Sequence, residues 1–460
     1  MAEKSRITII GGGVGGYPAA IKAARLGSEV TLIEKADLGG TCLNWGCIPT
    51  KSLLQSAEVM RVVKESEVFG IKAGTPRVDF PAVVKRKNQV VAKLRKGVEL
   101  LLAAKKIKVL KGTAEVLDPR MVKVIETDDR VRNDALIIAT GSIPGIPPIP
   151  GLDGSNFCDS NGFLVLDRLP PSAAIIGGGV VGVELAQVLS GLGCKATILE
   201  IMPQLVPDLD REIAGLLEIA LKEQGVAVVT NARVSQVRTV KHRSSVSYSV
   251  RGETREISVE RTVLATGRVP FTHGLHVERM GIEIRQRSIA VDDRMQTNVP
   301  GVYAVGDVVG GSMLAHVAMA EGECAAVNAL GGQRRMNYKA VPSCIYTNPE
   351  VASVGLSEEQ AKDKCEVKVG RFPFAGSGKA AVLNQSLGMV KIVADRKYGE
   401  IMGVHVIGPH ATELISEAVL GMTLETTVEE MARAIHPHPT VSEAMMEAAS
   451  SLVGGSIHMP

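Results

Sequence analysis

Apolar and polar positions follow two periods in the first part of this 460-residue chain, and together they predict strands that alternate with helices. The apolar run Ile7–Ile10 predicts a short buried strand, and residues 19–26 have helical composition before a second strand over Glu29–Glu34. The turn between the first strand and the helix is the glycine-rich run Gly11–Gly16. This succession is typical of a nucleotide-binding βαβ unit.

The same unit recurs about 170 residues further on, and the recurrence is the strongest organising signal in the chain. A strand over Ala173–Ile176 precedes the turn Gly177–Gly182, a helix over Val183–Leu192 and a strand over Lys195–Glu200. In both copies an acidic residue lies 18 positions after the third motif glycine. Two nucleotide-binding domains in one α/β chain are therefore predicted, and the α/β class follows from them.

A different pattern begins beyond about Ala340. Period-two strands over Met389–Ala394 and Gly403–Ile407, then a helix over Glu413–Thr423, predict an α+β domain without a glycine fingerprint. The Pro/Gly-rich run Ile143–Gly151 is the expected first domain boundary.

Composition narrows the function classes. Hydrophobic residues make up 45% and charged residues 22%, which excludes wholesale disorder, and 52 Lys+Arg against 49 Asp+Glu leaves no basic surplus for nucleic acid. The lysine-rich segment Lys85–Lys108 has apolar residues at helical spacing, which predicts a solvated amphipathic helix. No membrane-crossing run or targeting segment is found, so we expect a cytoplasmic protein that contacts neither nucleic acid nor membrane.

The two glycine turns predict cofactor sites with defined roles for their residues. The first glycine of each motif permits the turn, the second lets backbone approach a pyrophosphate, and the third lets helix and strand pack closely. Glu34 and Glu200 are placed to accept hydrogen bonds from a ribose diol. An acid at Glu200, with no arginine cluster after it, favours NAD over NADP. The six glycines are Gly11, Gly13, Gly16, Gly177, Gly179 and Gly182.

Two of the seven cysteines stand out. Cys42 and Cys47 lie five apart at the start of an expected helix, where slightly more than one turn places both thiols on one face, within reach of a disulfide. A helix N-terminus and Lys51 favour thiolates, so the pair predicts redox chemistry. No further ligands stand at metal spacing, and no metal site is expected. Cys158, Cys194, Cys324, Cys344 and Cys365 are predicted to be small buried residues.

The run Gly39–Lys51 (GGTCLNWGCIPTK), with the two fingerprints, resembles the pyridine nucleotide–disulfide oxidoreductases. The segment Tyr303–Asp307 is similar to the family's second flavin motif, and Val341–Gly355 resembles the opening of its dimerisation domain. The resemblance covers essentially the whole chain. It implies two Rossmann-like FAD- and NAD-binding domains followed by a C-terminal α+β dimerisation domain. The implied divisions are 1–145 (FAD domain, first part), 146–270 (NAD domain), 271–340 (central domain completing the FAD site) and 341–460 (dimerisation domain).

The resemblance also assigns roles to individual residues. Cys42 is the expected interchange thiol and Cys47 the thiol that faces the flavin, with Lys51 and Glu184 beside it. Further expected FAD contacts are Glu34, Lys35, Gly39, Gly40, Thr41, Ala114, Ala139, Thr140, Gly141, Asp307, Met313, Leu314, Ala315 and His316; further NAD contacts are Val234 and Gly267. The chain departs from the family at Phe271, where asparagine is common, so the usual turn hydrogen bond there is in doubt.

His438 is the expected acid–base group. Of the nine histidines, it combines a proline-containing turn with a carboxylate, Glu443, five positions on. The run from His436 to Glu443 (HPHPTVSE) is similar to the family's HxHPTxSE signature, which implies that His438 acts in the partner subunit's site within a homodimer.

The resemblance implies an oxidoreductase that converts protein-bound dihydrolipoamide to lipoamide with NAD⁺ through FAD. The implied partners are lipoyl-bearing acyltransferases or glycine-cleavage carrier proteins. Two alternatives stay open at this point. One is an NAD(P)H-dependent disulfide or metal-ion reductase of the same family, and the other is a non-catalytic flavoprotein that senses redox state or serves as a complex subunit.

Overall fold

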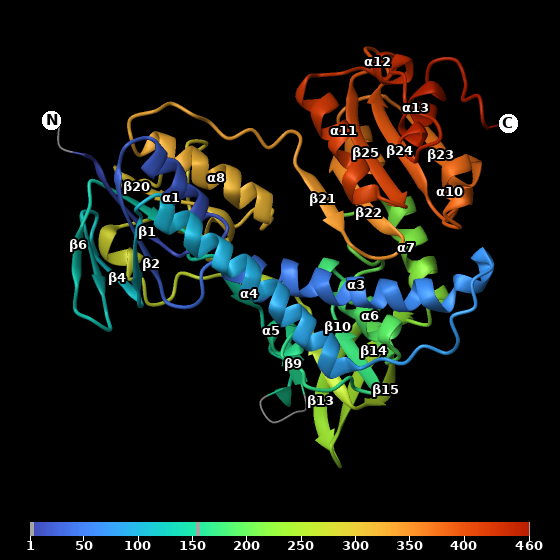
Figure 1. The fold of residues 1–460 in the computed structure, drawn as a ribbon, viewed down its shortest axis with the longest axis horizontal. Helices are drawn as coiled ribbons and strands as arrows, with labels where there is room; N and C mark the ends of the chain where they lie inside the picture. The colour runs from blue at the N-terminus through green and yellow to red at the C-terminus, as the bar shows by residue number, and fades with distance from the viewer. Residues whose placement is uncertain (1–3, 153–156, 460) are drawn as a thin grey trace.

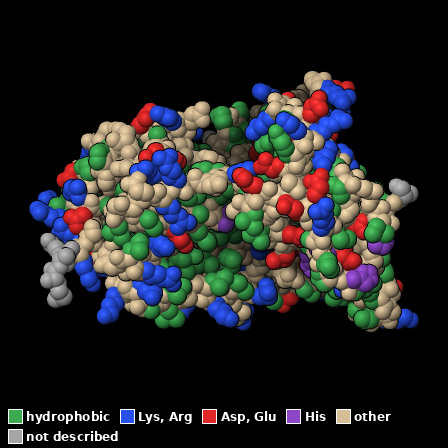
Figure 2. All heavy atoms as spheres, turned by 90° about the horizontal axis from the view of Figure 1, so that it is seen from above, with side chains coloured by type: hydrophobic (Ala, Val, Ile, Leu, Met, Phe, Trp, Pro, Cys, Tyr) green, Lys and Arg blue, Asp and Glu red, His purple; other side chains and the backbone are tan. Residues whose placement is uncertain are grey.

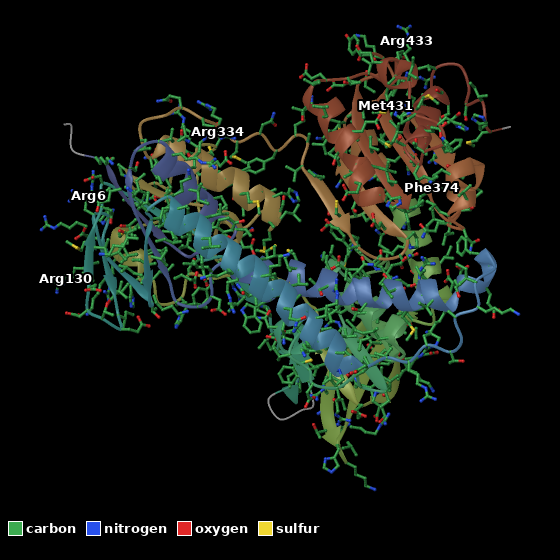
Figure 3. All side chains as sticks on the ribbon, viewed as in Figure 1. Arg6, Arg130, Arg334, Phe374, Met431 and Arg433 are labelled. Carbon is green, nitrogen blue, oxygen red and sulfur yellow. The ribbon has the colours of Figure 1, made fainter. Side chains whose placement is uncertain are left out.

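The structure, a computed structural model, describes residues 4–152 and 157–459. In the described residues, three five-stranded β-sheets with their helices form three bodies, and the long helices α3 and α4 run between them (Figure 1). In Figure 3, Arg6 and Arg130 lie at the outer end of the first body, far from Met431 and Arg433 in the third.

The first sheet is parallel and five-stranded, in the order β20-β7-β1-β2-β3. Its strand β20 comes from far along the chain, so the sheet is complete only when residues 302–304 return to its edge. Helix α1 packs against α8, which also returns from the later segment. The elements are β1 (Arg6–Ile10), α1 (Gly16–Arg25), β2 (Glu29–Glu34), β3 (Lys108–Lys111), β7 (Ala135–Ile138), β20 (Val302–Ala304) and α8 (Ala315–Asn328).

The second sheet repeats this plan in the order β12-β11-β10-β16-β9. Strand β10 pairs in parallel with β11 and β16, as β1 pairs with β2 and β7, so the predicted internal repeat is present. The elements are β9 (Phe157–Asp159), α5 (Ser160–Phe163), β10 (Ser172–Ile176), α6 (Val180–Leu192), β11 (Lys195–Leu199), α7 (Arg211–Glu223), β12 (Ala227–Val229) and β16 (Arg261–Leu264).

The duplication goes further than the sequence indicated. Each half also contains a three-stranded antiparallel sheet, inserted in the chain between two strands of its parallel sheet: β3 and β7 in the first half, β12 and β16 in the second. The first comprises β4 (Ala114–Asp118), β5 (Met121–Val124) and β6 (Arg130–Arg132), and the second β13 (Ala232–Val240), β14 (Arg243–Val250) and β15 (Glu253–Val259).

The third sheet is antiparallel, in the order β21-β22-β25-β24-β23, and confirms the predicted α+β section. Helices α11 and α13 pack on it over an apolar core that includes Phe372 and Phe374. The elements are β21 (Pro342–Ile345), β22 (Glu350–Gly355), α9 (Glu358–Lys362), β23 (Val367–Pro373), α10 (Gly378–Val382), β24 (Met389–Asp395), β25 (Ile401–Gly408), α11 (Ala411–Thr423), α12 (Val428–Arg433) and α13 (Glu443–Ser450).

The remaining elements connect these bodies. Strands β8 and β17 pair with each other and join the ends of the two nucleotide-binding halves. The connecting elements are α2 (Gly40–Asn44), α3 (Cys47–Lys64), η1 (Ser66–Phe69), α4 (Phe80–Ala104), β8 (Ser142–Pro144), β17 (Arg268–Pro270), η3 (Val277–Met280), β18 (Ile284–Arg285), β19 (Ser288–Ile289), η4 (Gly306–Val309) and η5 (Phe374–Gly376).

The lysine-rich helix differs from the sequence prediction in one respect. Helix α4 forms, but Lys87 is buried and donates a hydrogen bond of 2.5 Å to the carbonyl of Leu164. Conversely, Leu94 and Leu101 on the expected apolar stripe are exposed. The helix lies between two bodies, so its buried face is not a single stripe. On the face in Figure 2, acidic and basic side chains are interspersed, in keeping with the small net charge.

Within residues 4–152 and 157–459, no helix is both long and apolar enough to cross a membrane.

Candidate active site

The Cys42–Cys47 segment forms two helices where one was expected. Cys42 lies in the short helix α2, which ends at Asn44. Trp45 and Gly46 separate it from the 18-residue helix α3, whose first residue is Cys47. The two thiols are still neighbours, because their side chains share a hydrogen bond. Both cysteines are free thiols in the structure, the reduced form of the predicted pair.

Glycines fix this segment against the first nucleotide turn. Gly39 and Gly40 have φ of 96° and 58°, in the left-handed region that other residues adopt only at a cost. The Gly39 N–H donates to the carbonyl of Gly12 at 2.8 Å, and a Cβ on Gly40 would lie 2.6 Å from the Cα of Gly13. The thiols are therefore held beside the turn expected to carry a pyrophosphate.

The electrostatics separate the two thiols. A hydrogen bond from Cys42 and the charge of Lys51 outweigh burial and lower the pKa of Cys47 to about 7. Cys47 also stands at the N-terminus of α3, where the helix dipole favours an anion. The pKa of Cys42 is raised by its hydrogen bond to Cys47 and by burial. Cys47 is thus the thiolate of the pair near neutral pH, and Cys42 is the protonated partner.

Lys51 and Glu184 form an ion pair between α3 and α6. The Lys51 Nζ lies 2.9 and 2.8 Å from the two carboxylate oxygens of Glu184, whose side chain is only 4% exposed. A third element joins them, since the N–H of Tyr346, just after β21, donates to Glu184 at 3.0 Å. The structure therefore brings these two predicted site residues together and adds Tyr346, for which no role had been inferred.

Both glycine turns fit a dinucleotide. A Cβ on Gly16 would lie 1.8 Å from the carbonyl oxygen of Gly11, and one on Gly182 would lie 1.9 Å from that of Gly177. Helix and strand therefore approach too closely for any side chain at the third glycine. Gly179, the middle glycine of the second motif, instead faces open space on its Cβ side. A phosphate-binding turn requires close packing of helix and strand at its third glycine and open space beside its middle glycine.

The two acids expected to bind ribose make equivalent contacts in the two halves. Glu34 ends β2 and accepts hydrogen bonds from the N–H groups of Gly12 and Ala36, both at 2.6 Å. Glu200 directly follows β11 and accepts from the N–H groups of Gly178 and Met202, the latter at 2.7 Å. The two carboxylates repeat one another's geometry and stand over their glycine turns.

Asp307 reaches the thiol region through a network that includes residues not singled out from the sequence. Ser142 donates to Asp307, and the Arg268 Nε donates to the Ser142 hydroxyl at 2.7 Å. Arg268 also donates to the hydroxyl of Thr41, next to Cys42, at 3.2 Å. The only sequence signal for Arg268 was its place in the Gly-Arg-Val-Pro run. Because these residues lie on four separate segments, their contact depends on the fold.

The other expected cofactor residues occupy defined places. Ala114 begins β4, and 139–141 follow β7. Val234 lies in β13, and Gly267 directly precedes β17. Residues 313–316 lead into α8, where His316 Nε2 lies 2.9 Å from the carbonyl of Pro342. Lys35 Nζ lies 3.8 Å from the ring centroid of Phe271, whose N–H donates to the carbonyl of Gly141, on a distant segment, at 2.9 Å.

The histidine at position 438 is paired and exposed. Its Nδ1 lies 2.9 Å from Glu443 Oε1, and the second oxygen of Glu443 accepts from the N–H of Thr440 at 2.8 Å. The His438 side chain is 78% exposed within the single chain. A carboxylate on Nδ1 fixes the tautomer and leaves Nε2 directed away from it, the arrangement of an acid–base imidazole.

Among the described residues, three other histidines also lie beside carboxylates. His436 pairs with Glu417 at 2.9 Å, His458 with Glu447 at 2.6 Å and His276 with Glu278 at 3.3 Å. A carboxylate partner is therefore not unique to His438, but His436 differs because both of its ring nitrogens are engaged and its side chain is 8% exposed.

The remaining cysteines correct one expectation. Cys194 and Cys324 are buried as predicted. Cys158, Cys344 and Cys365 are only partly buried, and the first two pack at the margin of apolar clusters and not inside them. In the described part of the chain, no cluster of three or more His, Cys, Asp or Glu side chains is arranged to hold a metal ion.

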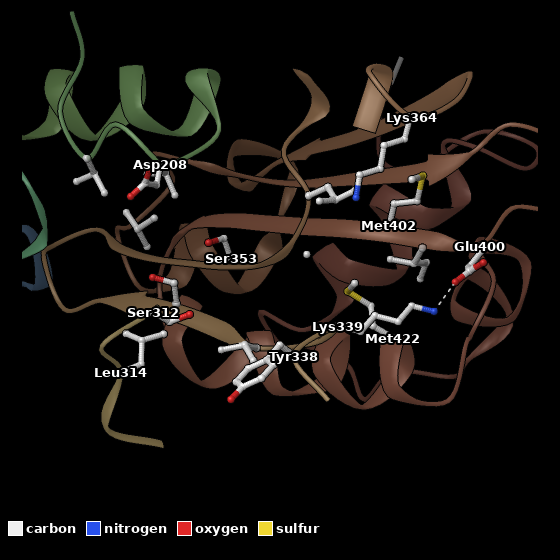
Figure 4. Close-up of a pocket in the computed structure, with 18 of the residues that line it drawn as sticks. Asp208, Ser312, Leu314, Tyr338, Lys339, Ser353, Lys364, Glu400, Met402 and Met422 are labelled. Atoms are coloured by element: carbon white, nitrogen blue, oxygen red, sulfur yellow. Dashed lines mark hydrogen bonds and ion pairs between the residues drawn. The ribbon is translucent and has the colours of Figure 1, made fainter. Parts of the chain in front are cut away.

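A cavity of about 970 Å³ lies between the loop before α7 and the third sheet. Its lining extends from Val180 in the second glycine turn to Met402 in β25. Figure 4 shows Asp208 on one side, Ser312 and Leu314 on another, and the Lys339–Glu400 ion pair at the far end. The cavity therefore lies beside the second glycine turn, which contributes Val180 to its lining.

Comparison with known proteins agrees with this geometry. Residues 5–322 match the model of the pyridine nucleotide-disulphide oxidoreductase family, and residues 341–449 match that family's dimerisation domain. The chain belongs to this family, and the predicted fold class is confirmed. It is an oxidoreductase that uses FAD and NAD.

Individual relatives narrow the comparison further. The chain is 42% identical to a dihydrolipoyl dehydrogenase of Bacillus subtilis over 100% of both chains. It is also 42% identical to a dihydrolipoyl dehydrogenase of Thermus scotoductus, over 98% of each. Among solved structures, the Cu(II) complex of the HOCl-induced flavoprotein disulfide reductase RclA of Escherichia coli is similar, with a TM-score of 0.88, 31% identity, and coverage of 97% of this chain and 99% of that one.

Proposed function

We propose that this chain is a dihydrolipoyl dehydrogenase, which oxidises protein-bound dihydrolipoamide to lipoamide with NAD⁺. The observation that carries the proposal is the Cys42–Cys47 thiol pair at the N-terminus of α3, with Cys47 beside Lys51. Full-length identity of 42% with dihydrolipoyl dehydrogenases supports the substrate, since the pair alone suits any small disulfide.

The proposed reaction begins from the oxidised enzyme, in which Cys42 and Cys47 form a disulfide. A substrate thiolate attacks the sulfur of Cys42, so a mixed disulfide forms and Cys47 leaves as a thiolate. The second substrate thiol gives its proton to His438 and attacks the other substrate sulfur, which is bonded to Cys42 in the mixed disulfide. The bond between that sulfur and Cys42 breaks, lipoamide leaves, and His438 returns the proton to the Cys42 sulfur. The substrate loses two electrons and the cysteine pair gains them. A leaving thiol with a pKa of about 7 makes the first step favourable.

FAD supplies the route by which the electron pair returns from the thiols to NAD⁺, re-forming the Cys42–Cys47 disulfide. This chain's own residues hold the two nucleotides. The turns at 11–16 and 177–182 bind the pyrophosphates, Glu34 and Glu200 accept the ribose hydroxyls, and Asp307 binds the ribityl chain. Lys51 and Glu184 stand between the two cofactor sites.

We infer that the active unit is a homodimer. The match of residues 341–449 to a dimerisation domain supports it, as does the exposure of His438 in the single chain. An imidazole that faces solvent in the single chain can act on a bound substrate only where a second protein surface completes the binding site. In the dimer, His438 and Glu443 of one subunit would complete the thiol site of the other.

The proposed domain division is 1–145, 146–270, 271–340 and 341–460, and the separate sheets described above support it. The proposed partners are lipoyl-bearing acyltransferases or glycine-cleavage carrier proteins. The proposed location is the cytoplasm, which the bacterial relatives support.

A second candidate is a disulfide or metal-ion reductase that runs in the opposite direction. The specific observation in its favour is the similarity of the whole chain to RclA, which is a disulfide reductase and was solved with Cu(II). Glu200 counts against NADPH as the donor, because its carboxylate would repel a 2′-phosphate.

A comparison of initial rates tests the proposal. We expect the purified holoenzyme to reduce NAD⁺ with dihydrolipoamide far faster than NADP⁺. We also expect it to turn over NADH or NADPH with glutathione disulfide or Cu(II) only slowly. The reverse ranking would favour the second candidate, and full flavin occupancy without turnover in any assay would favour a non-catalytic role.

A further inference from the structure

Tyr346 connects the third sheet to the ion pair beside the thiols. It follows β21 directly and touches both members of the pair. Its backbone N–H donates to Glu184 Oε1 at 3.0 Å, and the Lys51 Nζ lies over its ring, 4.6 Å from the centroid. One residue of the C-terminal region therefore contacts a helix from each nucleotide-binding half.

The Tyr346 ring contacts Lys51, the more exposed member of the ion pair. The Glu184 side chain is 4% exposed and fixed by three hydrogen bonds, whereas the Lys51 side chain is 29% exposed. An ammonium on the face of a neutral aromatic ring gains about 0.5–1 kcal/mol at a partly exposed site. Burial, with Cys344 and Glu184 nearby, raises the pKa of Tyr346 to about 12, so the phenol stays neutral.

The backbone around Tyr346 is held without help from its side chain. Asn348 donates through its N–H to Gln187 Oε1 at 2.8 Å and through its side chain to Glu58 at 2.9 Å. Gln187 and Gln224 both donate back to the carbonyl of Asn348. Changing the ring should therefore leave the path of the segment, and its N–H bond to Glu184, in place.

We propose that Tyr346 is a positioning residue, whose ring keeps the Lys51 ammonium beside Cys47 so that the charge of Lys51 stabilises the Cys47 thiolate. Lys51 lies one helical turn after Cys47 on α3, so a small swing of its side chain changes their separation. The inference rests on the proposed function for the role of Cys47 as the thiolate of the pair, but not on the identity of the substrate.

Other charged or titratable groups also face Cys47, and the test must separate them from Lys51. They come from four other segments: Cys42 on α2, Glu184 on α6, Arg268 on β17 and the Tyr346 phenol itself. The substitution Cys42→Ser removes the competing thiol at position 42 and retains a hydrogen-bond donor there.

The experiment measures the thiolate directly in the Cys42→Ser holoenzyme. Iodoacetamide alkylates Cys47, and mass spectrometry of the Cys47 peptide gives the alkylation rate at each pH. Three proteins are compared, each with Cys42→Ser: one with Tyr346 intact, one with Tyr346→Leu and one with Tyr346→Phe. We expect Tyr346→Leu to raise the apparent pKa of Cys47 by about half a unit, and Tyr346→Phe, which retains the ring face, to leave it unchanged.

A double-mutant cycle distinguishes positioning from a general change in packing. Lys51→Met should raise the Cys47 pKa by itself, and adding Tyr346→Leu should then raise it no further. A matched control is Tyr398→Leu, which removes the same kind of contact (Lys397 Nζ, 4.7 Å) at the exposed β24–β25 turn and should change nothing.

Two outcomes would overturn the proposal: an unchanged Cys47 pKa in Tyr346→Leu, or an equal shift with and without Lys51. If Tyr346→Leu does not fold, Tyr346→Met makes the same measurement with a flexible apolar side chain that has no ring face. Because no lipoamide enters the assay, a wrong substrate assignment would leave the result intact.

Discussion

His438 Nδ1 lies 2.9 Å from Glu443 Oε1 on an exposed turn, whereas His436, two residues earlier, has both ring nitrogens engaged and its side chain 8% exposed. The two histidines on this turn therefore differ in whether a ring nitrogen remains available for proton exchange. His438 can exchange a proton through Nε2, and His436 holds the turn against Glu417 on α11.

This contrast predicts opposite effects for two substitutions. His438→Gln should lower kcat for dihydrolipoamide by about 10²–10⁴-fold, the usual contribution of a general acid–base group, with little change in melting temperature. His436→Gln should lower the melting temperature and leave most of the activity. Steady-state rates and thermal unfolding of both variants check the assignment, which fails if the two histidines exchange behaviour.

Loss of one thiol should stop turnover without releasing the flavin. Cys47→Ser removes the leaving thiol, so no electron pair can reach the bound nucleotide, and dihydrolipoamide oxidation should fall to background. Cys194→Ser is the control, because Cys194 is buried in the second body, away from the thiol pair. Residual activity in Cys47→Ser at the wild-type level would contradict the proposed function.

Glu200 should set the affinity for NAD⁺. Replacing it by serine removes a charged acceptor and should raise KM for NAD⁺ about tenfold or more, since hydrogen bonds to charged groups are worth about 1.5–3 kcal/mol. NADP⁺ should become a better substrate, because the repulsive charge is gone. Glu34→Ser, its counterpart in the first turn, should instead lower flavin occupancy, measured as flavin absorbance per protein. Equal effects on both measurements in both variants would argue against separate sites.

Two glycines allow a paired test of the close approach in the second turn. Gly182→Ala would place a Cβ 1.9 Å from the carbonyl oxygen of Gly177 and should destabilise the fold by about 1–3 kcal/mol or more. Gly215 lies in helix α7 with nothing within 4 Å of its Cβ position, so Gly215→Ala should stabilise by about 0.5–1 kcal/mol. Urea unfolding measures both, and a neutral Gly182→Ala would mean that helix and strand separate more easily than the geometry implies.

Lys391, on β24, connects the third sheet to the start of helix α7 in the second nucleotide-binding half. Its side chain is 3% exposed, and its Nζ lies 2.9, 2.6 and 2.8 Å from Asp210, Glu212 and Glu358. Lys391→Met should cost about 3–5 kcal/mol because it leaves Asp210 buried and uncompensated. Lys96→Met, at an exposed pair with Glu99, should cost no more than about 1 kcal/mol.

The same cluster predicts a pH dependence. Burial raises the pKa of Glu358, but hydrogen bonds from Lys362 and Lys391 outweigh it and lower the pKa to about 2. A lowered folded-state pKa contributes stability above the unfolded value of about 4.3, and this is lost as pH falls toward the folded value. Wild-type unfolding free energy should therefore fall between about pH 4 and pH 2, and Lys391→Met should flatten this slope. An equal slope in both proteins would place the acid-sensitive groups elsewhere.

Much of the local structure could be predicted because local chemistry decides it. The glycine turns, the strands on either side of them and the acids at their ends follow from short-range rules, and their registers repeat between the two halves. The break between α2 and α3 was missed because two cysteines five apart fit one helix as well as two. The burial of Lys87 was missed because its carbonyl partner, Leu164, lies 77 residues away.

The class of fold, the two nucleotide turns and the thiol pair can be read from the sequence, since each is encoded by residue types at fixed short spacing. Which remote residues contact one another depends on how the sheets pack. The tertiary structure brought Tyr346 to Lys51 and Glu184, Arg268 to Thr41, and Glu417 to His436. Such contacts join segments that are remote in the chain, and they exist because the apolar faces of several sheets must be buried together, which no local pattern specifies.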